Sequence, residues 1–179
     1  KTIWNILSEH NFRTGSVGFW ATWPAETVNG ALITDAFIYR AKLEHTFFPA
    51  DHNGLFDKWS KEGERAFRDW KESYLRQEGL EDTWQDPRDI RYVTGQFEHF
   101  LEHMQFDFIK FCLARCIYHE FRPDFLAVYL RSPDLSSHFF YKDVFDNEGK
   151  AAFPETVKDR QNYNTLIPLI YQDMDNFLA

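Results

Sequence analysis

The chain has 179 residues, and its 20 Lys and Arg against 28 Asp and Glu give a formal net charge of −8. A general nucleic-acid surface needs clustered basic side chains, and no such block occurs, so this class of partner is not expected. The 19 Phe, 8 Tyr and 6 Trp, with only 8 Gly and 7 Pro, indicate a globular chain with a sizeable core. No apolar run reaches the roughly 18 residues that a membrane helix needs, so no membrane segment is predicted.

The first predicted elements are a short helix and a strand. Thr2 is placed to cap the helix, whose apolar residues are Ile3, Trp4, Ile6 and Leu7. Residues 16–21 are apolar and aromatic and predict a strand, which Pro24 ends. A helix followed directly by a strand is typical of α/β proteins. Residues 31–39 fit either a second strand or a short helix, and the chain between 47 and 54 has the composition of a loop.

Two long helices are predicted in the centre of the chain. Residues 55–77 have aromatic positions three and four apart with charged residues between them: Phe56, Trp59, Phe67, Trp70 and Tyr74. Asp86–Pro87 forms a second helix start, and the helix that follows runs for about thirty residues. It contains both cysteines, Cys112 and Cys116, which we interpret as neutral buried thiols. Residues 55–120 are therefore predicted to form a mainly helical excursion from the sheet.

A strand and a helix start adjoin one another later in the sequence. Residues 125–130, with the sequence FLAVYL, carry no charge and predict a buried strand of a parallel sheet. A helix should follow at once, because Ser132 can cap it and Pro133 suits its first position. Asp134 then falls in the first turn, close to the positive end of the helix dipole.

The predicted last helix, residues 154–178, contains Pro168, which should kink it near Asn164 because the ring removes a backbone hydrogen bond. Two strands cannot form a covered parallel sheet. The missing strands are expected from residues 31–39, from another subunit or from chain beyond these residues. The simplest organisation is one α/β domain segment over 1–179, incomplete at both ends, whose exposed strand edges favour self-association.

Asp134 and His138 are the strongest candidates for chemistry. They lie four apart on the predicted helix, so they share one face, about 6 Å apart, and could converge on one cation. Open α/β sheets place functional residues after the carboxyl ends of their strands, which is where these two lie. The alternative is that Asp134 only complements the helix dipole and that His138 is an ordinary surface or core residue. Two protein ligands do not complete a zinc site, so further ligands would have to come from elsewhere.

Thr22 and Glu26 are weaker candidates, for substrate binding, because they follow the first strand and should lie on the same rim of the sheet. A loop acid is more often solvated, and no base adjoins Thr22 to activate it as a nucleophile. His99 and His103 lie four apart on the second long helix and could bind a metal. The apolar stripe of that helix is expected to leave both on its wetter sides, where a solvated face is the simpler interpretation.

Two stretches carry a family resemblance. The first is Gly18–Gly30, GFWATWPAETVNG, preceded by Ile3–Leu7, IWNIL; the second is Pro123–Phe140, PDFLAVYLRSPDLSSHFF. In this order they resemble bacterial members of the type I phosphodiesterase and nucleotide pyrophosphatase family, within the alkaline phosphatase superfamily. The resemblance implies part of an α/β/α sandwich with a mostly parallel sheet, here with a helical insertion.

In that family, two metal ions, usually zinc, lie at the carboxyl end of the sheet and hold a phosphate ester substrate. The Asp and His of the family motif Asp-x-x-Ser-His ligate one metal, which the resemblance carries onto Asp134 and His138. The family's threonine or serine nucleophile attacks the ester, and the metals lower its pKa and neutralise the leaving oxygen. The implied cofactor is therefore zinc or another divalent metal.

This chain also departs from the family pattern. The family's nucleophile and first metal-binding Asp precede the Trp-Pro-Ala-Glu segment, an Asp-His-Gly element and a final His come later, and none is found here. Asp51 and His52 are followed by Asn53 and so do not supply that element. The chain is expected to be a segment of a metal-dependent phosphoric ester hydrolase, inactive alone, with at most one partial metal site and no catalytic residue. The alternative is a noncatalytic binding or assembly protein derived from this fold.

Overall fold

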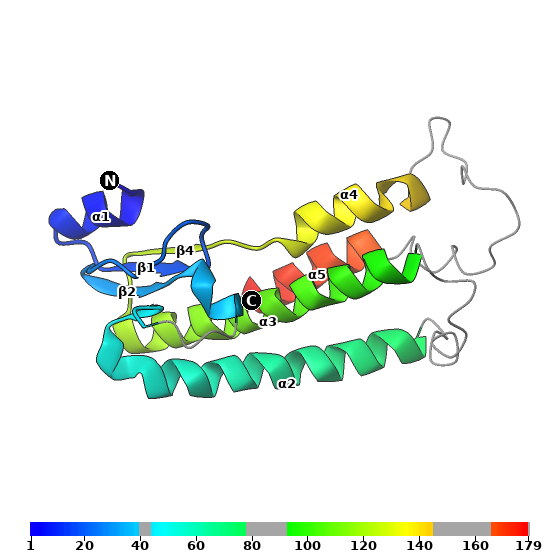
Figure 1. Ribbon diagram of the computed structural model, residues 1–179, viewed down its shortest axis with the longest axis horizontal. Helices are drawn as coiled ribbons and strands as arrows, with labels where there is room; N and C mark the ends of the chain where they lie inside the picture. Colours follow the sequence, from blue (N-terminus) through cyan, green and yellow to red (C-terminus); the bar gives the residue numbers. More distant parts are fainter. Residues whose placement is uncertain (40–43, 78–92, 145–165, 179) are drawn as a thin grey trace, which may run out of the picture. The chain divides into compact units, whose positions relative to one another are not determined.

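A computed structural model describes residues 1–39, 44–77, 93–144 and 166–178 (Figure 1). The chain divides into two compact units. The first comprises Lys1–Asp69 and Gln105–Leu130, and the second comprises Trp70–Met104 and Arg131–Ala179. Each unit is described by itself below.

Helices dominate the described residues. The α-helices are α1 Ile3–Glu9, α2 Asn53–Gln77, α3 Val93–Phe121, α4 Ser132–Val144 and α5 Leu166–Leu178. The strands are β1 Thr14–Val17, β2 Gly30–Ile33, β3 Phe47–Phe48 and β4 Phe125–Val128. Two 3₁₀ helices cover Asp35–Tyr39 and Ala50–His52. No helix within the described ranges is both long and apolar enough to cross a bilayer.

The four strands form one mixed sheet in the order β3-β2-β1-β4. Strand β1 is parallel to β2 on one side and to β4 on the other, while β3 is antiparallel to β2. The register aligns Val17 with Ile33 in β2 and with Val128 in β4. The predicted α/β class and the mostly parallel sheet are therefore confirmed.

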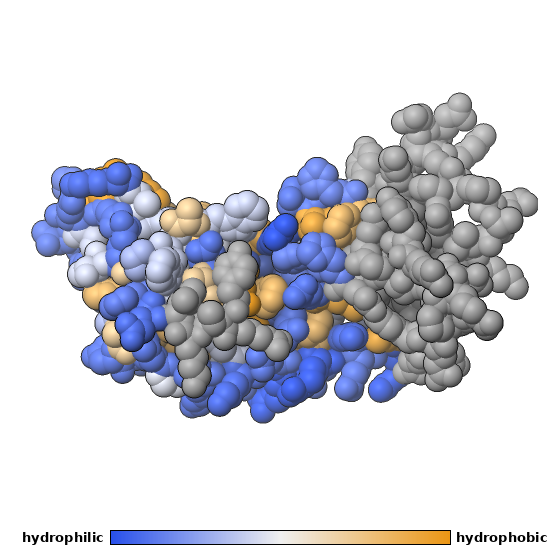
Figure 2. All heavy atoms as spheres, viewed as in Figure 1, coloured by the Kyte–Doolittle hydropathy of each residue, from blue (hydrophilic) through white to orange (hydrophobic). Residues whose placement is uncertain are grey.

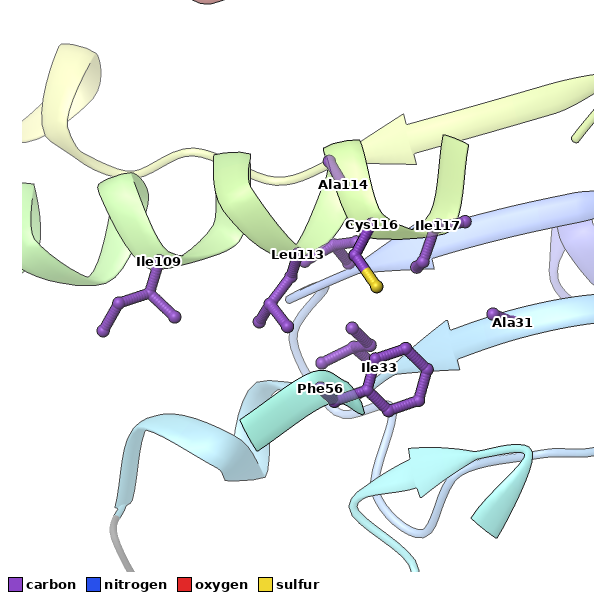
Figure 3. Close-up of a cluster of buried hydrophobic side chains, with 9 residues drawn as sticks. Ala31, Ile33, Phe56, Ile109, Leu113, Ala114, Cys116 and Ile117 are labelled. Atoms are coloured by element: carbon purple, nitrogen blue, oxygen red, sulfur yellow. The ribbon is translucent and has the colours of Figure 1, made fainter. Parts of the chain in front are cut away.

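Helices of the first unit cover both faces of the sheet. Successive side chains of a strand point to opposite faces, so each strand contributes residues to both sides. On one face, Trp4 of α1 packs with Val28 and Leu32. On the other face, α2 and α3 supply most of a cluster of nine buried residues: Val17, Ala31, Ile33, Phe56, Ile109, Leu113, Ala114, Cys116 and Ile117. Figure 3 shows Leu113 and Cys116 pointing from α3 toward Ile33 and Phe56. The first unit thus has helix, sheet and helix layers (Figure 1).

Helices α2 and α3 approach closely at Gly63. A Cβ atom at this position would lie 2.5 Å from Cα of Ile109, which is closer than packed atoms can come. The opposite side of α2 is hydrophilic and carries the exposed residues Lys58, Lys61 and Arg65 (Figure 2). This arrangement confirms the amphipathic helix predicted over residues 55–77.

The predicted first strand was misplaced. It was expected over residues 16–21, whereas β1 begins at Thr14 and ends at Val17. The chain leaves the extended conformation at once, with φ of +73° at Gly18 and +57° at Ala21. Neighbouring strands pair with β1 only over residues 14–17, so the apolar residues that follow form a turn instead.

The ambiguous stretch 31–39 contains both elements that its sequence allowed, because it spans most of β2 and a 3₁₀ helix. The loop expected between 47 and 54 was partly wrong. Phe47 and Phe48 form β3, paired with Leu32 and Ile33, and α2 already begins at Asn53. Strand pairing with a partner distant in sequence overrides the local composition at these two phenylalanines.

Strand β4 covers four of the six residues predicted and runs parallel to β1, as expected. It was predicted to be buried, but all four of its residues are half-buried because β4 is the last strand at its edge of the sheet. The described part of the second central helix, α3, spans 29 residues. The start predicted at Asp86–Pro87 and the kink predicted near Asn164 lie outside the described residues.

The second unit is held by contacts among helices. Helices α4 and α5 pack against each other. Phe100 of α3 and Phe140 of α4 are both buried, and their rings meet edge to face with centroids 5.5 Å apart. Trp70 donates a hydrogen bond from Nε1 to the Asp173 carboxylate over 2.6 Å. Aromatic side chains from distant parts of the sequence therefore build this unit.

Candidate functional site

Asp134 and His138 lie one turn apart near the start of α4. His138 Nε2 is 3.4 Å from Asp134 Oδ1, and the two side chains are 74% and 72% exposed. The sequence prediction that they share one helix face is confirmed by this contact. Both side chains are therefore accessible to an ion or ligand from solvent.

The local sequence explains this orientation. Helix α4 begins at Ser132, and the Leu135 N–H donates to the Arg131 carbonyl over 3.0 Å. Leu135 and Ser136 are buried, so the side of the helix that carries them faces the interior of the second unit. Asp134 lies before this pair and His138 lies two residues after it, so both project from another side of α4. The burial of the neighbours thus turns the candidate ligands toward solvent.

The separation of the two donor atoms fits a metal ion. Two ligand atoms about 2.0–2.1 Å from a tetrahedral zinc ion lie about 3.4 Å apart. The 3.4 Å between His138 Nε2 and Asp134 Oδ1 equals this value. An imidazole nitrogen and a carboxylate oxygen are both accepted zinc donors. The separation is therefore compatible with two corners of a zinc tetrahedron, and it is equally that of a direct Asp–His contact.

A third ligand is not found in the described part of the chain, where no group of three or more His, Cys, Asp or Glu side chains could hold a metal ion. A second Asp–His contact exists in the first unit, between Asp51 Oδ1 and His52 Nδ1 at 2.8 Å. These residues are adjacent in sequence and lie at the end of a 3₁₀ helix. The hydrogen bond and the charge of His52 lower the pKa of Asp51 below its usual value.

Thr22 and Glu26 follow β1 in the first unit. The Thr22 hydroxyl donates to the Phe19 carbonyl over 2.6 Å and accepts the Asp35 N–H over 3.3 Å. The Asp35 carboxylate accepts the Ala21 N–H over 3.1 Å. Thr22 therefore fixes the loop after β1, whereas Glu26 is exposed. Asp35, two residues after the end of β2, was not predicted as part of this loop, although an acidic residue close after a strand was a signal.

The two predicted pairs belong to different units, since Thr22 and Glu26 lie in the first unit and Asp134 and His138 in the second. Their expected position on one shared rim stays a prediction. Of the two pairs, Asp134 and His138 are the one whose side chains contact each other.

The expectation for His103 was wrong, because only 7% of this residue is exposed. Its ring meets that of His99 edge to face with centroids 4.6 Å apart, while His99 is exposed and lies 3.8 Å from the Glu102 carboxylate. Buried residues occur on more than one side of α3 in this region, including Phe100, Leu101 and Met104. A helix packed on more than one side has no single wet face, so the apolar stripe alone could not place His103.

A hollow of about 460 Å³ in the first unit contains none of the sequence-predicted site residues. Its lining includes three carboxylates, from Glu44, Asp57 and Glu64, and three phenylalanine rings, from Phe37, Phe47 and Phe106. Helices α2 and α3 and the chain around β3 bring these residues together. No local sequence pattern indicates this hollow, because the residues that line it come from four separate segments.

Comparison with known proteins identifies no relative, since no family model, curated protein or solved structure matches this chain.

Proposed function

We propose that this polypeptide belongs to a metal-dependent phosphoric ester hydrolase of the type I phosphodiesterase and nucleotide pyrophosphatase family. Asp134 and His138 supply two ligands to one divalent metal ion, most simply zinc. The observation that carries the proposal is the 3.4 Å separation of Asp134 Oδ1 and His138 Nε2 on an exposed helix turn. That separation suits two corners of a zinc tetrahedron.

The surrounding elements support an alkaline-phosphatase-like α/β/α sandwich. Strand β1 directly precedes the first stretch of the resemblance, Gly18–Gly30, and the parallel strand β4 lies within the second, Pro123–Phe140. Helix α1 covers one face of the sheet, and α2 and α3 cover the other. Helices α2, Asn53–Gln77, and α3, Val93–Phe121, fit the helical insertion proposed over residues 55–120.

The proposed roles follow from side-chain chemistry. Asp134 contributes negative charge and an oxygen donor, and His138 contributes the lone pair of its neutral imidazole. A bound metal would polarise the phosphoryl oxygens and neutralise the leaving oxygen. Glu26, which is exposed after β1, is the freer candidate for a substrate contact, because the Thr22 hydroxyl already bonds to Phe19 and Asp35. Two ligands do not complete a zinc site, so this chain alone is expected to bind zinc weakly and to lack hydrolase activity.

Direct zinc titration tests the proposal. Zinc is titrated into the chain, binding is followed by calorimetry, and the wild type should show weak binding. The His138→Ala and Asp134→Asn variants should each bind zinc at least about tenfold more weakly, because each loses one donor. Both side chains are exposed, so neither substitution should alter the fold.

The control is His52→Ala, which removes the histidine of the other Asp–His contact, where His52 is half-buried and its ring lies 5.0 Å from that of Phe121. This variant should retain the zinc affinity of the wild type. Equal zinc binding by the wild type and His138→Ala would refute the assignment. Absence of zinc binding by all of these proteins would favour the alternative, a noncatalytic binding or assembly protein.

A further inference from the structure

The hollow in the first unit is bordered by two helices and by the chain around β3. Helix α3 contributes Phe106 and Ile109, and the chain before α2 contributes Phe37 and the segment from Glu44 to Phe47. Helix α2 contributes four polar residues that are spaced four, three and four apart and so share one face of the helix: Asn53, Asp57, Ser60 and Glu64. All of these residues belong to the first unit.

Hydrogen bonds from the loop after β1 hold one border of the hollow in place. Trp23 donates from Nε1 to the Glu44 carbonyl over 3.0 Å. The Ala25 N–H donates to the His45 carbonyl over 2.7 Å. The backbone that carries the Glu44 side chain is therefore fixed before any ligand arrives. A preformed border lowers the entropy that a ligand must give up by ordering it.

Three carboxylates, from Glu44, Asp57 and Glu64, line the hollow without a cation of their own. Glu44 and Asp57 are exposed, and Glu64 is half-buried. Within the described ranges, none of the three forms an ion pair, and the lining contains neither Lys nor Arg. Carboxylates that share one hollow repel each other, so a cation that enters it is favoured.

Phenylalanine rings adjoin these carboxylates. Phe37, Phe47 and Phe106 are half-buried and line the same hollow, and the Phe47 ring lies 5.2 Å from that of the buried Phe56. The face of an aromatic ring attracts an organic cation. A metal ion instead needs several oxygen or nitrogen ligands that converge on one point, and no such group occurs among the described residues. The lining therefore suits an organic ammonium cation better than a metal ion.

We infer that this hollow binds a linear aliphatic polyamine. Asp57 and Glu64 are seven residues apart, and a rise of about 1.5 Å per residue separates their backbone positions by about 10 Å along α2. A single ammonium group compensates the charge at one end of this row, whereas a polyamine places ammonium groups along its length. The methylene groups between them would contact Phe106 and Ile109. The volume of about 460 Å³ is typical of a small-molecule site.

Calorimetric titration at constant ionic strength tests the class of ligand. Spermidine, which carries three ammonium groups on an aliphatic chain, should bind to the wild type. Butylamine, with one ammonium group, and octane-1,8-diol, with none, should each bind at least about tenfold more weakly, because each loses two or more ion pairs. Magnesium chloride should show no binding that competes with spermidine.

Substitutions on α2 locate the site. Asp57→Asn and Glu64→Gln should each weaken spermidine binding about fivefold, because each removes one charge from the hollow. The matched control is Asp69→Asn, which removes an exposed carboxylate of the same helix outside the hollow and should bind like the wild type. Phe37→Leu keeps an apolar side chain but removes the ring face, so it should weaken spermidine binding about threefold.

Four results would overturn the inference. The first is a wild type that binds no spermidine, and the second is octane-1,8-diol binding as tightly as spermidine. The third is an equal loss in Asp69→Asn and Glu64→Gln, which would show that the acidic surface as a whole attracts the polyamine. The fourth is spermidine binding that appears only in a double Arg40→Ala, Lys42→Ala variant, which would show that basic side chains of the chain itself compensate the carboxylates.

Discussion

Lys110 and Asp107 form a buried ion pair one turn apart on α3. Their Nζ and Oδ1 atoms are 2.9 Å apart, and the side chains are 6% and 3% exposed. The Lys110 amine lies 5.4 Å from the centre of the Tyr129 ring, at the end of β4. Its aliphatic stem fills the space beside Gly18, where a Cβ atom would lie 2.9 Å from Lys110 Cε. The pair therefore supports the carboxyl ends of both β1 and β4.

Replacement of Lys110 by Met should destabilise the first unit by roughly 3–5 kcal/mol, because it removes the ammonium group that lies 2.9 Å from the buried Asp107 carboxylate. Urea denaturation measures this change. The double variant Lys110→Met, Asp107→Leu should recover much of the loss, since it removes both charges together. Lys58→Met, at an exposed position of α2, is the control and should leave the stability nearly unchanged. A wild-type stability in the Lys110→Met variant would contradict the structural role of the pair.

Gly63 permits the close approach of α2 and α3, so its replacement by Ala should be destabilising. The new Cβ atom would lie 2.5 Å from Cα of Ile109, and neither backbone can yield without separating the helices. A loss of roughly 1–3 kcal/mol is expected from such overpacking. Thermal denaturation compares it with Gly54→Ala in the same helix, where no atom lies within 4 Å of the new Cβ. Gly54→Ala should be neutral or slightly stabilising, because Ala favours the helix more than Gly does.

Burial raises the pKa of Asp173 above its usual value of 3.8, although the hydrogen bond from Trp70 opposes the shift. The folded state then holds the proton more tightly than the unfolded state. The penalty for the charged carboxylate is complete above the raised pKa and disappears as pH falls toward 3.8. Asp173→Asn should therefore stabilise the protein at neutral pH, and the gain should vanish in acid.

Denaturation curves at several pH values measure this dependence. The amide oxygen of the Asn variant can still accept the Trp70 hydrogen bond, so the comparison isolates the charge. Asp175→Asn, at an exposed position of the same helix, provides the control. A destabilising effect of Asp173→Asn at neutral pH would show that the hydrogen bond to the charged carboxylate outweighs the cost of its burial.

Both cysteines should be unreactive in the folded protein. Cys112 and Cys116 are free and buried in α3. Burial raises the pKa of Cys116 to about 12 and that of Cys112 in the same direction, so neither forms a thiolate at neutral pH. A disulfide reagent should label neither thiol under native conditions and both after unfolding. Rapid labelling of the native protein would indicate that this part of α3 opens readily.

Local signals were sufficient for helix α2 and for the shared helix face of Asp134 and His138. The aromatic spacing of residues 55–77 predicts α2 to within two residues at its start, because the 3.6-residue period of a helix can be recognised directly in the sequence. The ends of the strands were harder to predict from the sequence. The end of β1 at Val17 and the pairing of Phe47 and Phe48 depend on partner strands that the local sequence does not reveal.

The sequence by itself determined that Asp134 and His138 share one face, because four residues make about one helical turn and Ser132 and Pro133 favour a helix start. Tertiary structure decided what surrounds them and which other residues are accessible. Burial of Leu135 and Ser136 turns the pair outward, while packing on several sides buries His103. The hydrogen bonds of a helix join residues four apart, so the local sequence can predict them. Burial and strand pairing depend on contacts between segments far apart in the sequence.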